Sequence, residues 1–154
     1  MILKNIKLGI SISIDSKLLE VLQTLGEKHL PNEFGGILVG YYSNDSRLLT
    51  ITETILPTKF KSSLYSFQRD TTGAEEELQA LYSMKPQQYY VGEWHTHPNA
   101  SPIPSGIDIN AMNSIISSKK VVILNPVLLI IGYSNGLAEY QFYVAVNNKL
   151  YKYE

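Results

Sequence analysis

The sequence predicts an α/β domain in which a mixed β-sheet is flanked by helices. The first observation is that apolar segments with strand periodicity alternate along the chain with segments of helical periodicity. The second is the dipeptide Asn135-Gly136 between two alternating apolar segments, which is typical of a β-hairpin. The third is the composition of the 154 residues, 44% hydrophobic and 18% charged, which indicates a single globular domain over 1–154.

The first third of the chain predicts one helix between strands. Apolar and polar residues alternate over 6–14, as in a half-buried strand. Asp15 or Ser16 is placed to cap the helix that follows. The apolar stripe of this helix is expected to consist of Leu18, Val21, Leu22 and Leu25. The continuous apolar run 35–42 predicts a buried strand, and the β-branched segment 47–56 predicts the next strand.

The middle of the chain predicts a short strand within 62–70 and then a helix. Thr72 and Glu75 have the spacing of a capping box, so we expect the helix over 73–84. Its inward residues are expected to be Ala74, Leu78, Leu81 and Tyr82. A strand over 88–97 follows.

The last third predicts a helix that begins at Ser105 and then three strands. The inward side of the helix is expected to carry Ile109, Met112 and Ile116. Strands are expected over 121–124 and 127–133, and the Asn-Gly turn leads into a strand over 137–146. The resulting order, β-α-β-β-β-α-β-α-β-β-β, is typical of a mixed sheet between helices.

Composition argues against several classes of function. The net charge is −1 without a long run of like charges, so we expect no nucleic-acid partner and no anionic membrane partner. The chain has no cysteine, so any metal must be held by His, Asp or Glu. The N-terminal segment lacks the features of a signal peptide, and no apolar run reaches membrane-spanning length. We therefore expect a soluble, cytoplasmic protein.

Two of the three histidines, His95 and His97, lie on one expected strand with a single residue between them. Side chains at i and i+2 lie on one side of a strand, roughly 6.5–7 Å apart, so both imidazoles can reach one ion. Asp108 follows in the first turn of a helix, and the loop can fold its carboxylate back. Two imidazoles and one carboxylate leave a fourth position for water on Zn²⁺. Taken singly, the histidines also fit strand packing, and the aspartate fits the helix dipole.

A water nucleophile requires a proton acceptor, and two glutamates are candidates. Glu93 shares the strand face of His95 and His97 by alternation. Glu33 precedes the buried strand over 35–42, which could run alongside. The residues alone leave both open, and Glu93 equally fits orienting an imidazole or a surface position.

The spacing of this group resembles the motif of the JAB/MPN (JAMM) metalloproteases, and the resemblance extends over nearly the whole chain. The matching residues are Glu33, Gly36, His95, His97, Pro98, Ser105 and Asp108. The resemblance implies a cytidine-deaminase-like α/β fold and zinc-dependent cleavage of isopeptide or peptide bonds next to ubiquitin-like modifiers. It also implies roles for individual residues: Zn²⁺ ligands at His95, His97 and Asp108, general base and then acid at Glu33, and oxyanion stabilisation at Ser105. It thus favours Glu33 over Glu93.

Within this family the chain is most similar to small stand-alone bacterial members. Some of these are encoded with E1- and E2-like enzymes in antiphage conjugation operons of the cyclic-oligonucleotide type. The resemblance implies a protein substrate with a flexible C-terminal tail, either ubiquitin-like or a conjugated nucleotidyltransferase, and E1/E2-like partners. Phe67, Arg69 and Asp70 fall near a substrate-contacting region of related enzymes, or simply connect a strand to a helix. The alternatives are a processing peptidase for a sulfur-carrier protein and a non-catalytic MPN scaffold, which typically lacks ligands that this chain keeps.

Overall fold

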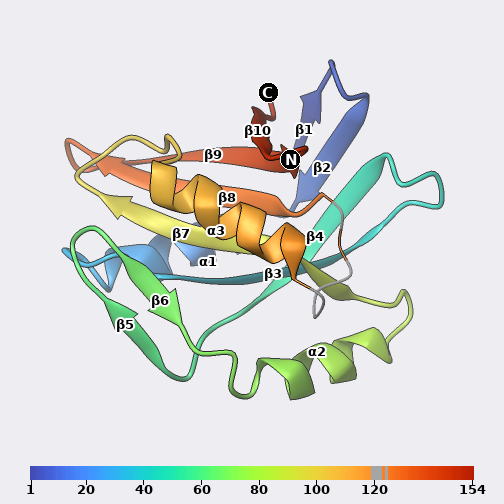
Figure 1. Ribbon diagram of the computed structural model, residues 1–154, viewed down its shortest axis with the longest axis horizontal. Helices are drawn as coiled ribbons and strands as arrows, with labels where there is room; N and C mark the ends of the chain where they lie inside the picture. The colour runs from blue at the N-terminus through green and yellow to red at the C-terminus, as the bar shows by residue number, and fades with distance from the viewer. Residues whose placement is uncertain (119–122, 124) are drawn as a thin grey trace.

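An eight-stranded mixed sheet forms the centre of the computed structural model, which describes residues 1–118, 123 and 125–154 (Figure 1). In spatial order its strands are β1 (Ile2–Asn5), β2 (Ile10–Ile14), β4 (Leu48–Ile55), β3 (Gly35–Tyr42), β7 (Tyr89–Pro98), β8 (Val127–Ser134), β9 (Leu137–Val146) and β10 (Lys149–Lys152). The pairs β2–β4 and β7–β8 are parallel, and β3 pairs antiparallel with both β4 and β7. The predicted α/β class with a mixed sheet is confirmed.

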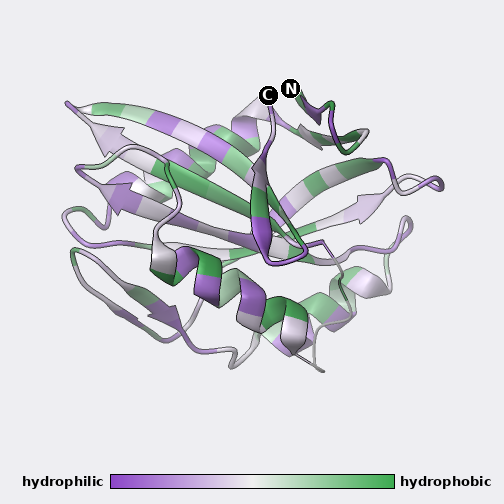
Figure 2. Ribbon diagram, turned by 45° about the horizontal axis from the view of Figure 1, so that its top comes forward, coloured by the Kyte–Doolittle hydropathy of each residue, from purple (hydrophilic) through white to green (hydrophobic). Residues whose placement is uncertain are grey.

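Helices α1 (Ser16–Glu27) and α3 (Gly106–Ser117) cover opposite faces of this sheet, with α3 in front and α1 behind in Figure 1. Neighbouring residues of β8 show why, because their side chains alternate between the faces. Leu129 belongs to the large apolar cluster that contains Leu22 of α1, whereas Leu128 packs in the cluster of Met112 of α3. In Figure 2 the hydrophobic residues of β8 form a green stretch at the centre of the sheet. β8 is therefore buried on both sides, which explains why its residues form a nearly continuous apolar run.

A third helix and a small hairpin complete the fold. Helix α2 (Ala74–Tyr82) follows the hairpin formed by β5 (Phe60–Ser62) and β6 (Phe67–Arg69). The single short strand predicted within 62–70 is thus the second half of a two-stranded unit. None of the helices within the described ranges has the length and apolar character that a bilayer span requires.

The outer ends of the sheet meet, because β1 lies beside the last residues of the chain. The amide of Lys4 donates to the carbonyl of Glu154 at 2.6 Å, and the Glu154 amide donates back at 2.8 Å. The side-chain amide of Asn5 also donates to the Lys152 carbonyl at 2.8 Å. The two termini accordingly lie side by side in Figures 1 and 2. This contact covers strand edges that would otherwise expose unpaired backbone groups.

The prediction of a strand over 6–14 is wrong for residues 6–9. The strand begins at Ile10, and Ile6 is 89% exposed in a turn. Asn5 stabilises this turn, since its side chain accepts the Leu8 amide at 2.9 Å and its carbonyl accepts the Gly9 amide at 3.0 Å. The turn joins β1 to β2, so hairpin pairing overrides the local alternation. Strands β1 and β10 were not predicted.

Helix α1 begins as predicted, with Asp15 accepting the Lys17 amide at 2.8 Å. Leu18, Leu22 and Leu25 of the predicted stripe pack in the core, but Val21 does not. Val21 is 50% exposed. The buried residues of the helix are Leu19, Leu22 and Gly26. A Cβ at Gly26 would collide with the Tyr133 hydroxyl, so the glycine permits the helix to approach the sheet.

The capping box predicted for α2 does not form. Gly73, with a φ of 85°, occupies the N-cap position without a side-chain bond, while the Thr72 hydroxyl donates to Asp70 at 2.7 Å. Tyr82, predicted to point inward, is 53% exposed.

In α3 the N-cap at Ser105 and the burial of Met112 are confirmed, but Ile109 is 36% exposed. Ile116 packs against β8 and β9 together with Met112, as predicted, and Ile115, which was not predicted, joins them. Strand 127–133 and the hairpin at Asn135-Gly136 are confirmed by β8 and β9. The strand predicted over 121–124 lies largely outside the described residues.

Candidate metal centre

Strand β7 presents both histidines on one face. Trp94 and Thr96, which alternate with them, are 1% and 0% exposed on the opposite face. The side chains of His95 and His97 are 13% and 11% exposed. β7 lies between β3 and β8, so its backbone is held on both sides by strand pairing. The alternation of side chains along the strand, from which the sequence placed both imidazoles on one side, is thus present in the structure.

Asp108 reaches the histidines through the capping box of α3. The Asp108 amide donates to the Ser105 hydroxyl oxygen at 3.2 Å, and the Ser105 amide donates to Asp108 Oδ2 at 2.6 Å. These reciprocal bonds hold the carboxylate back over the first turn of the helix. Because Ser105 Oγ accepts in this pair, its own hydroxyl proton stays available to another acceptor.

The donor atoms of the three side chains converge on one place. His95 Nε2 lies 3.0 Å from His97 Nε2 and 3.0 Å from Asp108 Oδ1, and His97 Nε2 lies 3.4 Å from Asp108 Oδ2. Ligands bound tetrahedrally at about 2.0–2.1 Å from Zn²⁺ are roughly 3.3–3.4 Å apart, so this spacing fits such an ion. His97 Nδ1 lies 3.3 Å from the Ser101 carbonyl. A proton on Nδ1 that donates there leaves the Nε2 lone pair free for a metal.

The charges of this group support ligand chemistry. Burial by itself would raise the pKa of Asp108, but hydrogen bonds from His95 and His97 outweigh it and hold that pKa well below its usual range. Burial likewise acts to lower the pKa of His97, and the Asp108 carboxylate reverses this, so the pKa is raised. Asp108 is therefore ionised at neutral pH, and a metal ion competes with a proton for His97.

Glu33 stands beside this group on the segment that leads into β3. Its amide donates to the Ser63 carbonyl at 2.8 Å, and its carbonyl accepts the Ser62 hydroxyl. Burial raises the pKa of the Glu33 carboxyl, while the charges of His95 and His97 act to lower it. A carboxyl with a raised pKa, in the field of the candidate ligands, accepts a proton more readily than an ordinary carboxylate, which suits proton transfer.

Sequence reasoning missed the residue that ties Glu33 to the ligand strand. Thr96 is fully buried and bonds the neighbour of Glu33 twice, because Thr96 Oγ1 accepts the Phe34 amide at 2.9 Å and the Thr96 amide donates to the Phe34 carbonyl at 2.8 Å. The signal available in the sequence was a hydroxyl residue between two candidate ligands, on the opposite face of the strand.

The glycine of the Glu33-x-x-Gly36 motif has a steric reason. A Cβ at Gly36 would lie 2.6 Å from the Ile55 carbonyl oxygen and 3.0 Å from Trp94 Nε1. At Gly35, which pairs with His95 in the sheet, a Cβ would collide with the Trp94 backbone and lie 2.9 Å from His95 Cα. Gly35 thus permits the close approach of β3 to the ligand strand, and Gly36 leaves room for the β4 backbone and the Trp94 side chain.

The competing glutamate, Glu93, is bound by other groups. Arg69 donates from Nε to Glu93 Oε2 at 2.9 Å and from Nη2 to Oε1, and the Tyr90 hydroxyl donates to Oε1 at 3.0 Å. Of the residues considered near the substrate, Phe67 packs on Phe34 with ring centroids 5.7 Å apart. Asp70 accepts bonds from Thr72 in the connection to α2.

Comparisons with known proteins agree with this geometry. The family described as prokaryotic homologs of the JAB domain matches residues 15–144. A CD-NTase/cGAS isopeptidase from Enterobacter hormaechei is 41% identical over 123 residues, which cover 79% of this chain and 67% of that protein. A protein of the same name from Pseudomonas aeruginosa is 32% identical over 90 residues, 57% of this chain and 56% of that one.

Two further similarities concern a second type of relative and the fold. The probable metalloprotease y4qB of Sinorhizobium fredii is 32% identical over 102 residues, which cover 64% of this chain and 62% of that protein. Aligned residues thus span 56% to 67% of the length of these relatives. A solution structure from Desulfitobacterium hafniense superimposes with a TM-score of 0.61 at 18% identity, over 92% of this chain and 88% of that one. That likeness shows a shared fold.

Proposed function

This chain belongs to the prokaryotic homologues of the JAB domain, and on that premise we propose that it is a zinc-dependent isopeptidase. It is a hydrolase of the metallopeptidase class that cleaves the bond after the C-terminus of a conjugated protein. The observation that carries the proposal is the convergence of the His95, His97 and Asp108 donor atoms within 4.8 Å of one another, with Glu33 beside them.

The chain's own residues divide the work of hydrolysis. When bound by the His-His-Asp group, a divalent cation supplies Lewis acidity, which lowers the pKa of water and polarises a carbonyl. Glu33 takes a proton from the attacking water and donates it to the departing amine, so the bond breaks without leaving an anionic nitrogen. Ser105 donates its free hydroxyl proton to the oxygen that becomes negative as the carbonyl is attacked.

The proposed substrate is a protein with a flexible C-terminal tail joined to an amine. The names of two relatives, CD-NTase/cGAS isopeptidase, support a conjugated nucleotidyltransferase and a role in antiphage defence. The name of the third, a probable metalloprotease, also fits peptide-bond hydrolysis. E1/E2-like partners and a cytoplasmic location stay predictions.

The test uses the purified full chain and a nucleotidyltransferase joined through its C-terminus to a lysine side chain. We expect zinc-dependent cleavage that a chelator abolishes. Glu33→Gln should lower kcat about 10²–10⁴-fold with zinc content retained, because only the proton acceptor is removed. Glu53→Gln, at an exposed glutamate of the neighbouring strand β4, is the matched control. A Glu33→Gln protein that cleaves as fast as wild type would contradict the proposal.

Two further substrates test the alternatives. A linear fusion cleaved in preference to the lysine conjugate indicates a processing peptidase, and a sulfur-carrier precursor ending in glycines tests that substrate directly. A protein that binds little zinc and cleaves none of the three is a scaffold.

A further inference from the structure

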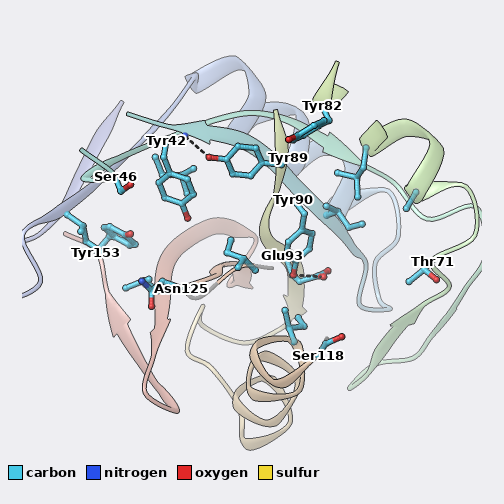
Figure 3. A pocket seen from close by; sticks show the side chains of 18 of the residues that line it. Tyr42, Ser46, Thr71, Tyr82, Tyr89, Tyr90, Glu93, Ser118, Asn125 and Tyr153 are labelled. Carbon is cyan, nitrogen blue, oxygen red and sulfur yellow. Dashed lines mark hydrogen bonds between the residues drawn. The ribbon is translucent and has the colours of Figure 1, made fainter. Parts of the chain in front are cut away.

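An ion pair joins the hairpin β5–β6 to the strand that carries both candidate histidines. Arg69 of β6 makes two parallel bonds to Glu93 of β7, and Tyr90 adds a third to the same carboxylate. Figure 3 shows Tyr90 and Glu93 together at the wall of a cavity of about 840 Å³. The Arg69 and Glu93 side chains are only 20% and 16% exposed. A shielded, bidentate pair fixes orientation as well as distance, unlike an exposed ion pair.

The loop end of the same hairpin holds Glu33. Ser63 accepts the Glu33 amide and the Ser62 hydroxyl donates to the Glu33 carbonyl, so both backbone groups of the proton acceptor are bonded to the hairpin. At the open end of the hairpin, Arg69 binds Glu93, which lies two residues before His95 on the same face of β7. One two-stranded unit therefore contacts the proton acceptor at one end and the ligand strand at the other.

We propose that Arg69 and Glu93 form a positioning pair, which sets the place of Glu33 relative to His95 and His97 through hairpin β5–β6. The inference rests on the proposed function, because the place of Glu33 matters there as that of the proton acceptor. Apolar contacts keep the hairpin near the sheet without this pair, since Phe60 lies 5.2 Å from Phe34 between ring centroids. Such contacts tolerate changes of direction, whereas the guanidinium–carboxylate fork does not.

Arg69→Lys tests the pair, because lysine keeps the charge and cannot form the fork. We expect kcat to fall by about 10²-fold, the loss that a displacement of roughly 1 Å can cause, with KM and zinc content unchanged. Independently of activity, hydrogen exchange of the Glu33 amide should accelerate, while the Thr96 amide stays protected. Arg47→Lys, at an exposed arginine of the β3–β4 turn, is the matched control. Glu93→Gln should reproduce both effects, and Glu53→Gln neither.

The outcomes separate this inference from the proposed function. An Arg69→Lys protein with wild-type kcat, or with slow Glu33 exchange, overturns the positioning role, and so does a raised KM with unchanged kcat, which would place Arg69 in substrate binding. Should Arg69→Lys fail to fold, Glu93→Gln gives the same two measurements. An inactive wild type, or a fully active Glu33→Gln protein, contradicts the proposed function instead, and the exchange measurement still decides whether the pair holds Glu33.

Discussion

At the level of single residues, the candidate site depends on a few polar groups buried next to its reactive side chains. Thr96 shows this most directly, because it separates the two histidines in sequence and faces away from them. Its two bonds to Phe34 fix the distance between the ligand strand and the segment that carries Glu33. Valine has nearly the same shape but would leave the Phe34 amide without its partner in a buried place.

Thr96→Val should therefore lower the free energy of unfolding by about 1–3 kcal/mol, measured by urea denaturation of the metal-free protein. Thr96→Ser keeps the accepting oxygen and should lie closer to wild type. Thr24→Val, at an exposed helical threonine, should change stability by less than about 0.5 kcal/mol. Equal effects at the two threonines would show that the buried bond contributes little.

At the level of elements, the start of α3 joins a structural role to a chemical one. The sequence predicted that this helix begins at Ser105, and the structure adds a capping box between Ser105 and Asp108, which have the spacing that such a box requires. The same bonds that satisfy the free amides of the first turn also aim a candidate metal ligand. At α2 the same spacing does not form a capping box. Thr72 lies three residues before Glu75, but its hydroxyl donates to Asp70.

Ser105→Ala is expected to lower the free energy of unfolding by about 1 kcal/mol and to weaken zinc binding, because Asp108 loses one of the bonds that orient it. Urea denaturation and zinc titration measure the two effects. Ser105→Thr should restore both, since threonine keeps the hydroxyl. Thr72→Ala is the matched control and should be within about 0.5 kcal/mol of wild type. Unchanged zinc affinity in Ser105→Ala would show that the cap does not orient Asp108.

At the level of the whole molecule, the candidate site is assembled from three distant parts of the chain. Glu33 precedes β3, the histidines lie on β7 and Asp108 belongs to α3. A metal that binds only when these parts are together must stabilise the folded state. The third histidine, His29, offers an internal comparison, because it stacks on Phe34 with ring centroids 3.6 Å apart instead of joining the group.

Zinc at about 100 times its Kd should raise the thermal midpoint of the wild-type chain by roughly 5–10 °C, measured by scanning calorimetry. His95→Ala and His97→Ala should lose most of this increase. His29→Asn should keep it, whatever its own stability, because His29 lies outside the ligand group. A zinc-dependent increase of the same size in His97→Ala would place the ion elsewhere.

The sequence by itself determined the features that depend on local spacing. Alternation on β7 placed two imidazoles on one face, Ser105 marked the start of α3, and a continuous apolar run marked the buried strand β3. Only the tertiary structure paired Glu93 with Arg69, bound Glu33 to the hairpin β5–β6 and added the strands β1 and β10. Local periods follow from backbone geometry within one element, whereas these contacts join residues whose separation in the chain says nothing about which strands become neighbours. The tertiary contacts of the hairpin therefore decided that Glu93 is bound by an arginine, whereas Glu33 lies in the field of the candidate ligands.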